Sequence, residues 1–229
     1  MTEQLTAAQV APREKFTTIY SGMDVEPFLR ADEQRQTLRA ACGFRADHVV
    51  IGKIARLFPL KGHEYLISAA GRVVRQAPHV RFLLVGDGIL REELQRQIVA
   101  SGLQDYVSFA GLVDPSQIPA YVGAMDVLVH CSLREGLARA LPQALLAGKP
   151  VVSYDIDGAR EVVQNGETGF LLEPMSIEPL ADRLILLAEQ PELRHRLGAA
   201  GRARCEQPFR HEFMTARIRE LYQRLAEPS

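Results

Sequence analysis

Short apolar runs alternate with amphipathic stretches along most of this chain, and the alternation predicts its secondary structure. The apolar runs are rich in β-branched residues and too short for helices, so we expect them to form buried strands. They cover residues 16–20, 48–55, 80–85, 107–109, 126–129, 151–154 and 169–172. The intervening stretches place apolar residues at helical spacing. The helices that they predict cover residues 32–42, 61–76, 89–101, 117–122 and 137–147, with a further helix beginning at 158–161.

Strands that alternate with helices of this length imply an α/β fold, in which a doubly wound parallel sheet has helices on both faces. Residues 177–225 predict only helices, with breaks near Pro191 and Pro208. Residues 1–11 have the pattern of the end of a helix, which Pro12 terminates because its ring cannot continue a helix. We see no internal repeat, low-complexity tract or interdomain linker after this point, so we expect one domain.

The composition argues against several classes of protein. A net charge of −1 on 229 residues is not that of a general nucleic-acid or membrane-surface binder. The three cysteines (Cys42, Cys131 and Cys205) are far apart and lack Cys-x-x-Cys spacing, which predicts reduced thiols and a cytoplasmic protein. The six histidines have no metal-ligand spacing, so we expect no metal. We find no apolar run long enough to cross a bilayer and no signal-peptide core.

The turn after the strand at 126–129 is the first candidate for chemistry. Such turns lie at the carboxyl edge of a parallel sheet, where these folds bind ligands. The backbone N–H groups at the expected helix start, near Gly136 and Leu137, suit a phosphate. Glu135 stands at the mouth of this turn, and a carboxylate there favours a neutral polyol such as a sugar.

Three other strand ends should meet the same edge. Arg56 and Lys61 follow the strand at 48–55, and two cations beside a helix start make an anion site with enough charge for a diphosphate. Glycines at 86, 88 and 111 would let the backbone approach a ligand closely. Each feature alone is also explained by a solvated charge or an ordinary turn; their coincidence at one edge favours a ligand site.

These positions carry a resemblance to a known family. The chain resembles the C-terminal, donor-binding domain of retaining glycosyltransferases of the GT-B fold, in glycosyltransferase family 4 (group 1). The matching segments are residues 20–24, 56–62, 85–88, 124–129, 135–136, 147–152 and 165–171, with single matches at Phe28, Gly111, Ser132 and Glu161. The resemblance implies a Rossmann-like sheet, and it implies transfer of a hexosyl group from a nucleotide-diphosphate sugar to a glycan, lipid or small-molecule acceptor.

The resemblance also implies a role for each site residue. Arg56 and Lys61 match the pair that binds the diphosphate of the donor and stabilises it as leaving group. Glu135 matches the first of two glutamates in the motif of the family, close to the hydroxyls of the transferred sugar. The remaining donor contacts are expected from the backbone of Gly136, Leu137 and Ala138, from Leu112 and Val113 beside the base, and from Gly86, Gly88, Gly111 and Ser132.

The chain departs from the family pattern at two neighbouring positions. The second glutamate of the motif, which holds the ribose, falls at Gln143. An amide still hydrogen-bonds a diol but without charge assistance, so we expect weaker donor binding. Pro142 would remove a hydrogen bond inside the predicted helix, and we expect a kink there.

The acceptor-binding domain of the family is not part of this sequence. We therefore interpret residues 1–15 as the remnant of an interdomain helix or linker, and residues 16–229 as the nucleotide-sugar-binding domain. We expect a metal-independent reaction with little activity from this chain alone, an exposed apolar face near residues 208–225, and membrane contact only through the missing domain. Two alternatives stay open, a nucleotide-sugar epimerase of the same fold and a non-catalytic sugar-nucleotide-binding module.

Overall fold

A six-stranded parallel sheet forms the centre of the protein, of which a computed structural model describes residues 2–226. Its strand order is β3-β2-β1-β4-β5-β6. The strands are β1 (Val49–Ile54), β2 (Val80–Val85), β3 (Val107–Gly111), β4 (Val127–His130), β5 (Val151–Tyr154) and β6 (Gly169–Leu172). The order reverses between β1 and β4, which is the switch point where doubly wound sheets bind ligands. The predicted α/β, Rossmann-like fold is confirmed.

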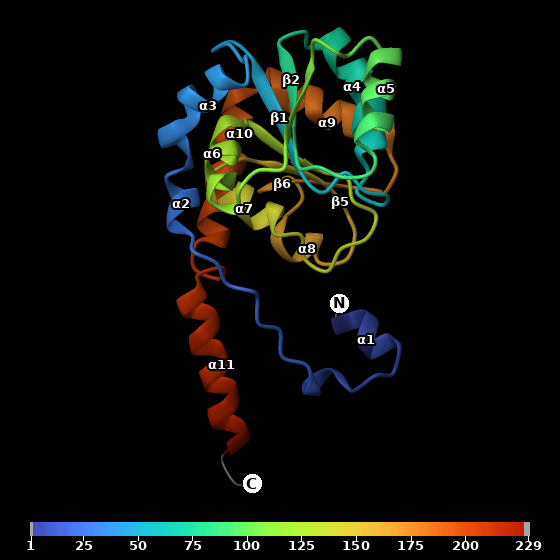
Figure 1. Cartoon of the computed structure of the whole chain (residues 1–229). Helices are drawn as coiled ribbons and strands as arrows, with labels where there is room; N and C mark the ends of the chain where they lie inside the picture. The colour runs from blue at the N-terminus through green and yellow to red at the C-terminus, as the bar shows by residue number, and fades with distance from the viewer. Residues whose placement is uncertain (1, 227–229) are drawn as a thin grey trace.

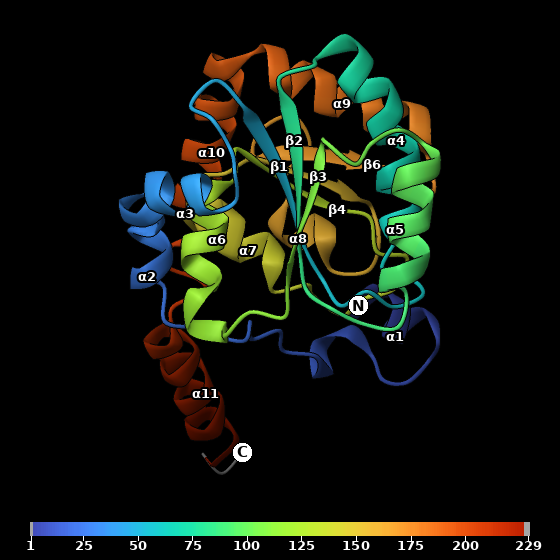
Figure 2. The same ribbon diagram turned by 45° about the horizontal axis from the view of Figure 1, so that its top comes forward.

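Helices cover both faces of the sheet, as Figures 1 and 2 show. One face packs against α4 (His63–Gln76), α5 (Arg91–Ala100) and α9 (Ile177–Glu189). The other face packs against α2 (Glu26–Leu29), α6 (Ile118–Ala124), α7 (Ala140–Leu146) and α8 (Ala159–Val162). Successive strand residues enter opposite cores: Val49 and Ile51 face α4, whereas Val50 faces α7.

The predicted strand at residues 16–20 is wrong. This segment follows α1 (Thr2–Ala7) and the short η1 (Arg13–Lys15), and its backbone joins none of the six strands. Its apolar side chains are half-buried away from the sheet, and the ring of Tyr20 stacks on Phe209, with centroids 5.2 Å apart. An apolar run too short for a helix can thus lie against a helix connection rather than within a sheet.

The N-terminal helix ends earlier than Pro12. Gln9 has a φ of 57°, and the N–H of Val10 donates to the carbonyl of Leu5 at 3.1 Å. A left-handed residue with this hydrogen bond closes a helix without help from a proline.

The C-terminal part is helical as expected. Helix α9 is followed by α10 (Pro191–Cys205) and α11 (His211–Ala226), so the predicted breaks near Pro191 and Pro208 are confirmed. Helix α11 extends away from the sheet (Figure 1) and has no buried side chain among its described residues. Ile218, Tyr222 and Leu225 are exposed on it. That a further domain packs against this apolar face stays a prediction. No helix within residues 2–226 combines the length and the apolar character needed to cross a membrane.

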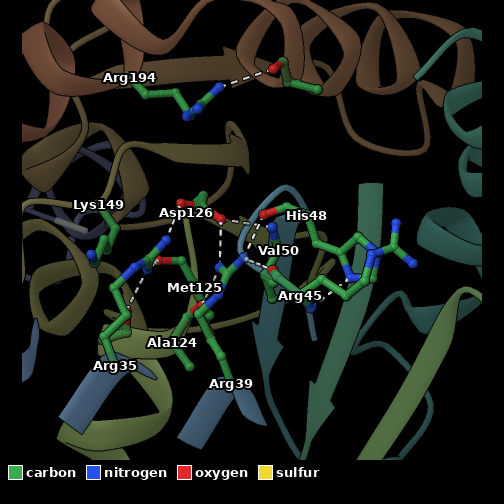
Figure 3. A network of polar contacts seen from close by, with 12 residues as sticks. Arg35, Arg39, Arg45, His48, Val50, Ala124, Met125, Asp126, Lys149 and Arg194 are labelled. Carbon is green, nitrogen blue, oxygen red and sulfur yellow. Dashed lines mark hydrogen bonds and ion pairs between the residues drawn. The ribbon is translucent and has the colours of Figure 1, made fainter. Parts of the chain in front are cut away.

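Helix α3 (Arg35–Ala41), which follows the short η2 (Ala31–Gln34), is tied to the sheet through Asp126 (Figure 3). The Asp126 carboxylate accepts hydrogen bonds from Arg35, from Arg39 at 3.1 Å and from the backbone N–H of Val50 at 2.7 Å. Burial acts to raise the pKa of Asp126, but Arg35, Val50 and Arg39 outweigh it, so its pKa lies below the ordinary value. Asp126 therefore joins α3, β1 and the start of β4 by charge.

We predict that Asp126→Ala lowers the free energy of unfolding by about 3 kcal/mol, because it leaves Arg39, 7% exposed, without its carboxylate. Urea denaturation measures this difference. The contribution of Asp126 is present above the ordinary pKa of Asp, about 3.9, and is lost as the pH falls through the lower folded pKa, so parent and variant should converge in acid.

The matched control is Asp47→Ala, which removes the exposed partner of Arg45 and should leave stability near that of the parent. Equal stability of parent and Asp126→Ala at neutral pH would contradict the structural role assigned to this carboxylate.

Candidate functional site

Loops at the carboxyl ends of β1, β2 and β3 are joined by backbone hydrogen bonds. The N–H of Leu57 donates to the carbonyl of Asp87 at 2.9 Å, and the N–H of Gly86 donates to the carbonyl of Gly111 at 2.9 Å. The edge that the sequence predicts is therefore one continuous surface.

The glycines of this edge have structural reasons for being glycine. A Cβ atom on Gly86 would lie 2.1 Å from the carbonyl oxygen of Ala55, and one on Gly88 would lie 2.5 Å from that of Leu57. These glycines let two loops of the protein approach each other, which explains their presence without a ligand. A Cβ atom on Gly111 would lie 3.7 Å from a guanidinium nitrogen of Arg91, an ordinary contact, so its φ of 73° explains the glycine there.

The loop after β1 also packs on the loop after β4. Gly62 has a φ of 69°, and a Cβ atom there would lie 1.9 Å from the carbonyl oxygen of Cys131. The N–H of Leu133 donates to the carbonyl of Leu60 at 2.8 Å. These contacts place Lys61 directly beside the residues that follow Cys131.

Lys61 and Glu135 are in direct contact as an ion pair, with side chains 18% and 24% exposed. The same oxygen of Glu135 lies 3.8 Å from Nε2 of His130. His130 and then Lys61 lower the pKa of Glu135 to about 2, against the opposing effect of burial. Burial lowers the pKa of His130, so at neutral pH the carboxylate is charged and the imidazole is neutral.

Arg56 lies in the same loop as Lys61. It is exposed, and its guanidinium carbon is 5.1 Å from the centre of the Phe58 ring. The structure therefore brings Lys61 and Glu135 into contact and holds Arg56 on an aromatic ring earlier in the loop.

The prediction that Gly136 and Leu137 start a helix is wrong. Helix α7 begins at Ala140, and Gly136, Leu137 and Ala138 lie in the loop before it. The carbonyl of Gly136 accepts the N–H of Gly158 at 3.0 Å, which joins this loop to the one after β5. The backbone N–H groups of these residues can therefore bind a ligand only from a loop, and not from the N-terminus of a helix.

The predicted kink at Pro142 is also wrong. Pro142 is the third residue of α7, and N–H groups in a first turn have no partner inside the helix. A proline costs no hydrogen bond at this place. Gln143 follows it and is half-buried.

The other predicted residues differ in their access to a ligand. Leu112 is 86% exposed just after β3, and Val113 beside it is half-buried. Ser132 is fully buried, and its hydroxyl has no hydrogen-bond partner among the described residues. A bound molecule would reach Ser132 only after the loop moves.

A cavity of about 330 Å³ adjoins the loop that follows Glu135. Gly136, Leu137 and Arg139 line it from that loop, and residues 16–21 line it from the N-terminal segment. The backbone of Gly136 and Leu137 thus borders a space large enough for a small ligand.

The sequence comparisons agree with this geometry. The family model described as glycosyl transferases group 1 matches residues 34–204. The chain belongs to this family. The match contains Arg56, Lys61, Glu135 and Gln143, and it includes all six strands of the sheet.

Several known proteins are similar to the chain. A GDP-mannose-dependent monoacylated alpha-(1-6)-phosphatidylinositol monomannoside mannosyltransferase of Corynebacterium glutamicum is 31% identical over 216 residues, which are 91% of this chain and 56% of that protein. The crystal structure of Anabaena Alr3699/HepE in complex with UDP and glucose matches 97% of this chain and 60% of its own, with a TM-score of 0.86 and 29% identity.

A third similarity concerns the fold alone. The C-terminal domain of a glycosyl transferase group 1 family protein (LpcC) from Francisella tularensis matches 86% of this chain and 98% of its own, with a TM-score of 0.69 and 23% identity. The chain spans about half the length of the curated relatives that it matches.

Sequence reasoning missed Asp157, which positions the loop of this group 1 domain. Its carboxylate accepts the backbone N–H of Glu135 at 2.7 Å, and its own φ is 44°. The Asp157–Gly158 pair is a turn signal that could have drawn attention to it.

His130 and Lys53 also have a larger part than the sequence indicated. His130 lies beside Glu135 and is 3% exposed. Lys53 lies on β1 and is 1% exposed, and its ammonium nitrogen has no hydrogen-bond partner among the described residues. Burial lowers its pKa. A lysine within an apolar strand was the available signal for it.

We predict that Asp157→Ala loosens residues 131–139, because the N–H of Glu135 loses its charged acceptor. Hydrogen–deuterium exchange should show faster exchange in that loop, with a loss of about 1–2 kcal/mol in unfolding free energy. Asp157→Asn keeps an acceptor and tolerates a positive φ, so its loop should exchange nearly as slowly as that of the parent.

Asp155→Ala is the control, because the carboxylate of this neighbouring residue binds Arg160 and not the loop at 131–139. Slow exchange of residues 131–139 in Asp157→Ala would show that other contacts hold Glu135.

Proposed function

We propose that this chain is the donor-binding, C-terminal domain of a retaining glycosyltransferase of family 4, which transfers a hexosyl group from a nucleotide-diphosphate sugar. The observation that carries the proposal is the contact of Lys61 with Glu135 at the switch point of the sheet. It places a cation for a diphosphate beside a carboxylate for sugar hydroxyls. UDP in a similar structure and GDP-mannose in the name of a relative support a nucleotide sugar as ligand.

The chemistry asked of this chain is electrostatic. In the proposed reaction negative charge develops on the departing diphosphate, and the ammonium of Lys61 and the guanidinium of Arg56 would stabilise that charge. Glu135, ionised at neutral pH, would accept hydrogen bonds from the sugar. The exposed side chain of Leu112 is offered to the base. We expect no metal to take part.

We further propose that transfer requires an acceptor-binding domain packed over this site. The chain covers about half of its curated relatives, and its fold matches a C-terminal domain of the same family. Two halves would exclude water from the cleft, and alone this half would transfer little. We place the protein in the cytoplasm, with any membrane contact made through the other domain.

Gln143 favours a second candidate, a module that binds nucleotide sugars without catalysis. An amide there gives the ribose a weaker partner than the second glutamate of the family pattern. Product formation separates the two candidates: turnover of a nucleotide sugar by the protein with its acceptor domain supports the transferase, and binding without turnover supports the module.

We predict that Lys61→Ala weakens binding of a nucleotide sugar about ten- to hundredfold, because charge-assisted hydrogen bonds to the diphosphate are lost. Arg56→Ala should weaken it in the same direction. Calorimetry with UDP-, GDP- and ADP-sugars identifies the ligand and measures the change.

Arg45→Ala is the control, since Arg45 is an exposed arginine paired with Asp47 before β1, at the opposite edge of the sheet. Parent-like affinity in both Lys61→Ala and Arg56→Ala would mean that the diphosphate site lies elsewhere.

We predict that Gln143→Glu strengthens nucleotide-sugar binding about fivefold, because an ionised acceptor makes stronger hydrogen bonds to a ribose diol. Gln143 is half-buried on α7, and glutamate has nearly the same shape. The dissociation constants of the parent and the variant for the same nucleotide sugar test this. Weaker binding in the variant would remove Gln143 from the proposed ribose site.

A further inference from the structure

Lys61 is not a free cation in this protein, because its ammonium is paired with the Glu135 carboxylate. The backbone holds it there: Leu60 and Gly62, on either side, have φ values of 67° and 69°. A leucine with positive φ is strained, and the hydrogen bond from Leu133 to the carbonyl of Leu60 helps to hold it. The loop is thus built to present Lys61 to the segment that carries Glu135.

Glu135 is fixed from its own side as well. Its backbone N–H is bound to Asp157 at 2.7 Å, and its carboxylate has the buried His130 ring 3.8 Å away. Neither neighbour carries a positive charge at neutral pH, since burial lowers the pKa of His130. Among the ion pairs of the described residues, Lys61 is therefore the partner of this carboxylate that carries a full positive charge.

The proposed function gives these two residues different partners in the complex. A diphosphate oxygen would bind the ammonium of Lys61. Glu135 would then share Lys61 with the diphosphate or lose its contact with Lys61. The hydroxyls of a bound sugar can replace that partner, because each donates a hydrogen bond to an ionised acceptor. A nucleoside diphosphate without its sugar takes the ammonium of Lys61 from Glu135 and offers the carboxylate no replacement.

We propose that Glu135 is a specificity-determining residue, which competes for Lys61 and so selects the intact nucleotide sugar over the sugar-free nucleoside diphosphate. This inference rests on the proposed function. After transfer, the remaining diphosphate no longer has a sugar to occupy Glu135, and the carboxylate takes Lys61 back. The ion pair of the free protein then favours release of that product.

The test compares two ligands on one substitution. Calorimetry measures the dissociation constants of UDP, GDP and ADP, and of UDP-glucose, GDP-mannose and ADP-glucose, with the parent and with Glu135→Gln. We expect Glu135→Gln to bind the sugar-free nucleotide about tenfold more tightly than the parent. The matching nucleotide sugar should bind no more tightly, so the preference for the sugar collapses.

Two further variants separate competition from simple charge repulsion. In a Lys61→Gln background, Glu135→Gln should give no gain for the sugar-free nucleotide, because there is no ammonium to release. Glu64→Gln removes a half-buried carboxylate in the first turn of α4 without touching this ion pair, and should leave both affinities within about twofold of the parent.

Each outcome decides the inference. Unchanged or weaker binding of the sugar-free nucleotide to Glu135→Gln overturns it, and so does a gain that persists without Lys61. If the parent binds none of the six ligands, the proposed function fails and this inference fails with it. If the parent binds a nucleotide sugar and Glu135→Gln keeps the preference for the sugar, this inference is rejected and the proposed function stands.

Discussion

The close approach of Gly62 to the carbonyl oxygen of Cys131 is the constraint on which the site depends. No other residue fits there, since a Cβ atom would lie 1.9 Å from that oxygen and the φ of 69° suits glycine. The contact lays the start of α4 on the loop after β4. Lys61 and Glu135, 74 residues apart in sequence, become neighbours as a result. The chemistry of the protein is thus a consequence of backbone packing at the switch point of a parallel sheet.

His130, which lies beside this ion pair, is buried and uncharged at neutral pH. Burial also lowers the pKa of Lys53, which lies in the same sheet. A carboxylate surrounded in this way depends strongly on its one charged contact. Such a pair responds to an arriving anion more sharply than two solvated charges would, because little water is present to screen the exchange.

Much of the fold could be predicted from the sequence, because turn residues mark the ends of several apolar runs. The strands at 80–85 and 169–172 were predicted to the residue. The segment at 16–20 was not, since its Tyr20 packs on Phe209, and an apolar pattern does not say which distant surface will cover it. The apolar pattern before Ala140 continues into a loop, so the start of α7 was placed too early.

The site was predicted as an edge and not as a set of contacts. Parallel strands bring their carboxyl ends together, which put Lys61 and Glu135 in one region. Their direct pairing depends on the positive φ values of Gly62 and Leu60, which the residue pattern did not predict. Asp157 was missed for the same reason, because its role is to hold a backbone N–H in a loop far along the chain.

A crystal structure of this protein with its nucleotide-diphosphate sugar tests the central claim most directly. The account predicts the ammonium of Lys61 about 3 Å from a phosphate oxygen, with the Glu135 carboxylate on hydroxyls of the sugar. A nucleotide bound at another edge of the sheet, or a diphosphate far from an unbroken Lys61–Glu135 pair, would contradict it.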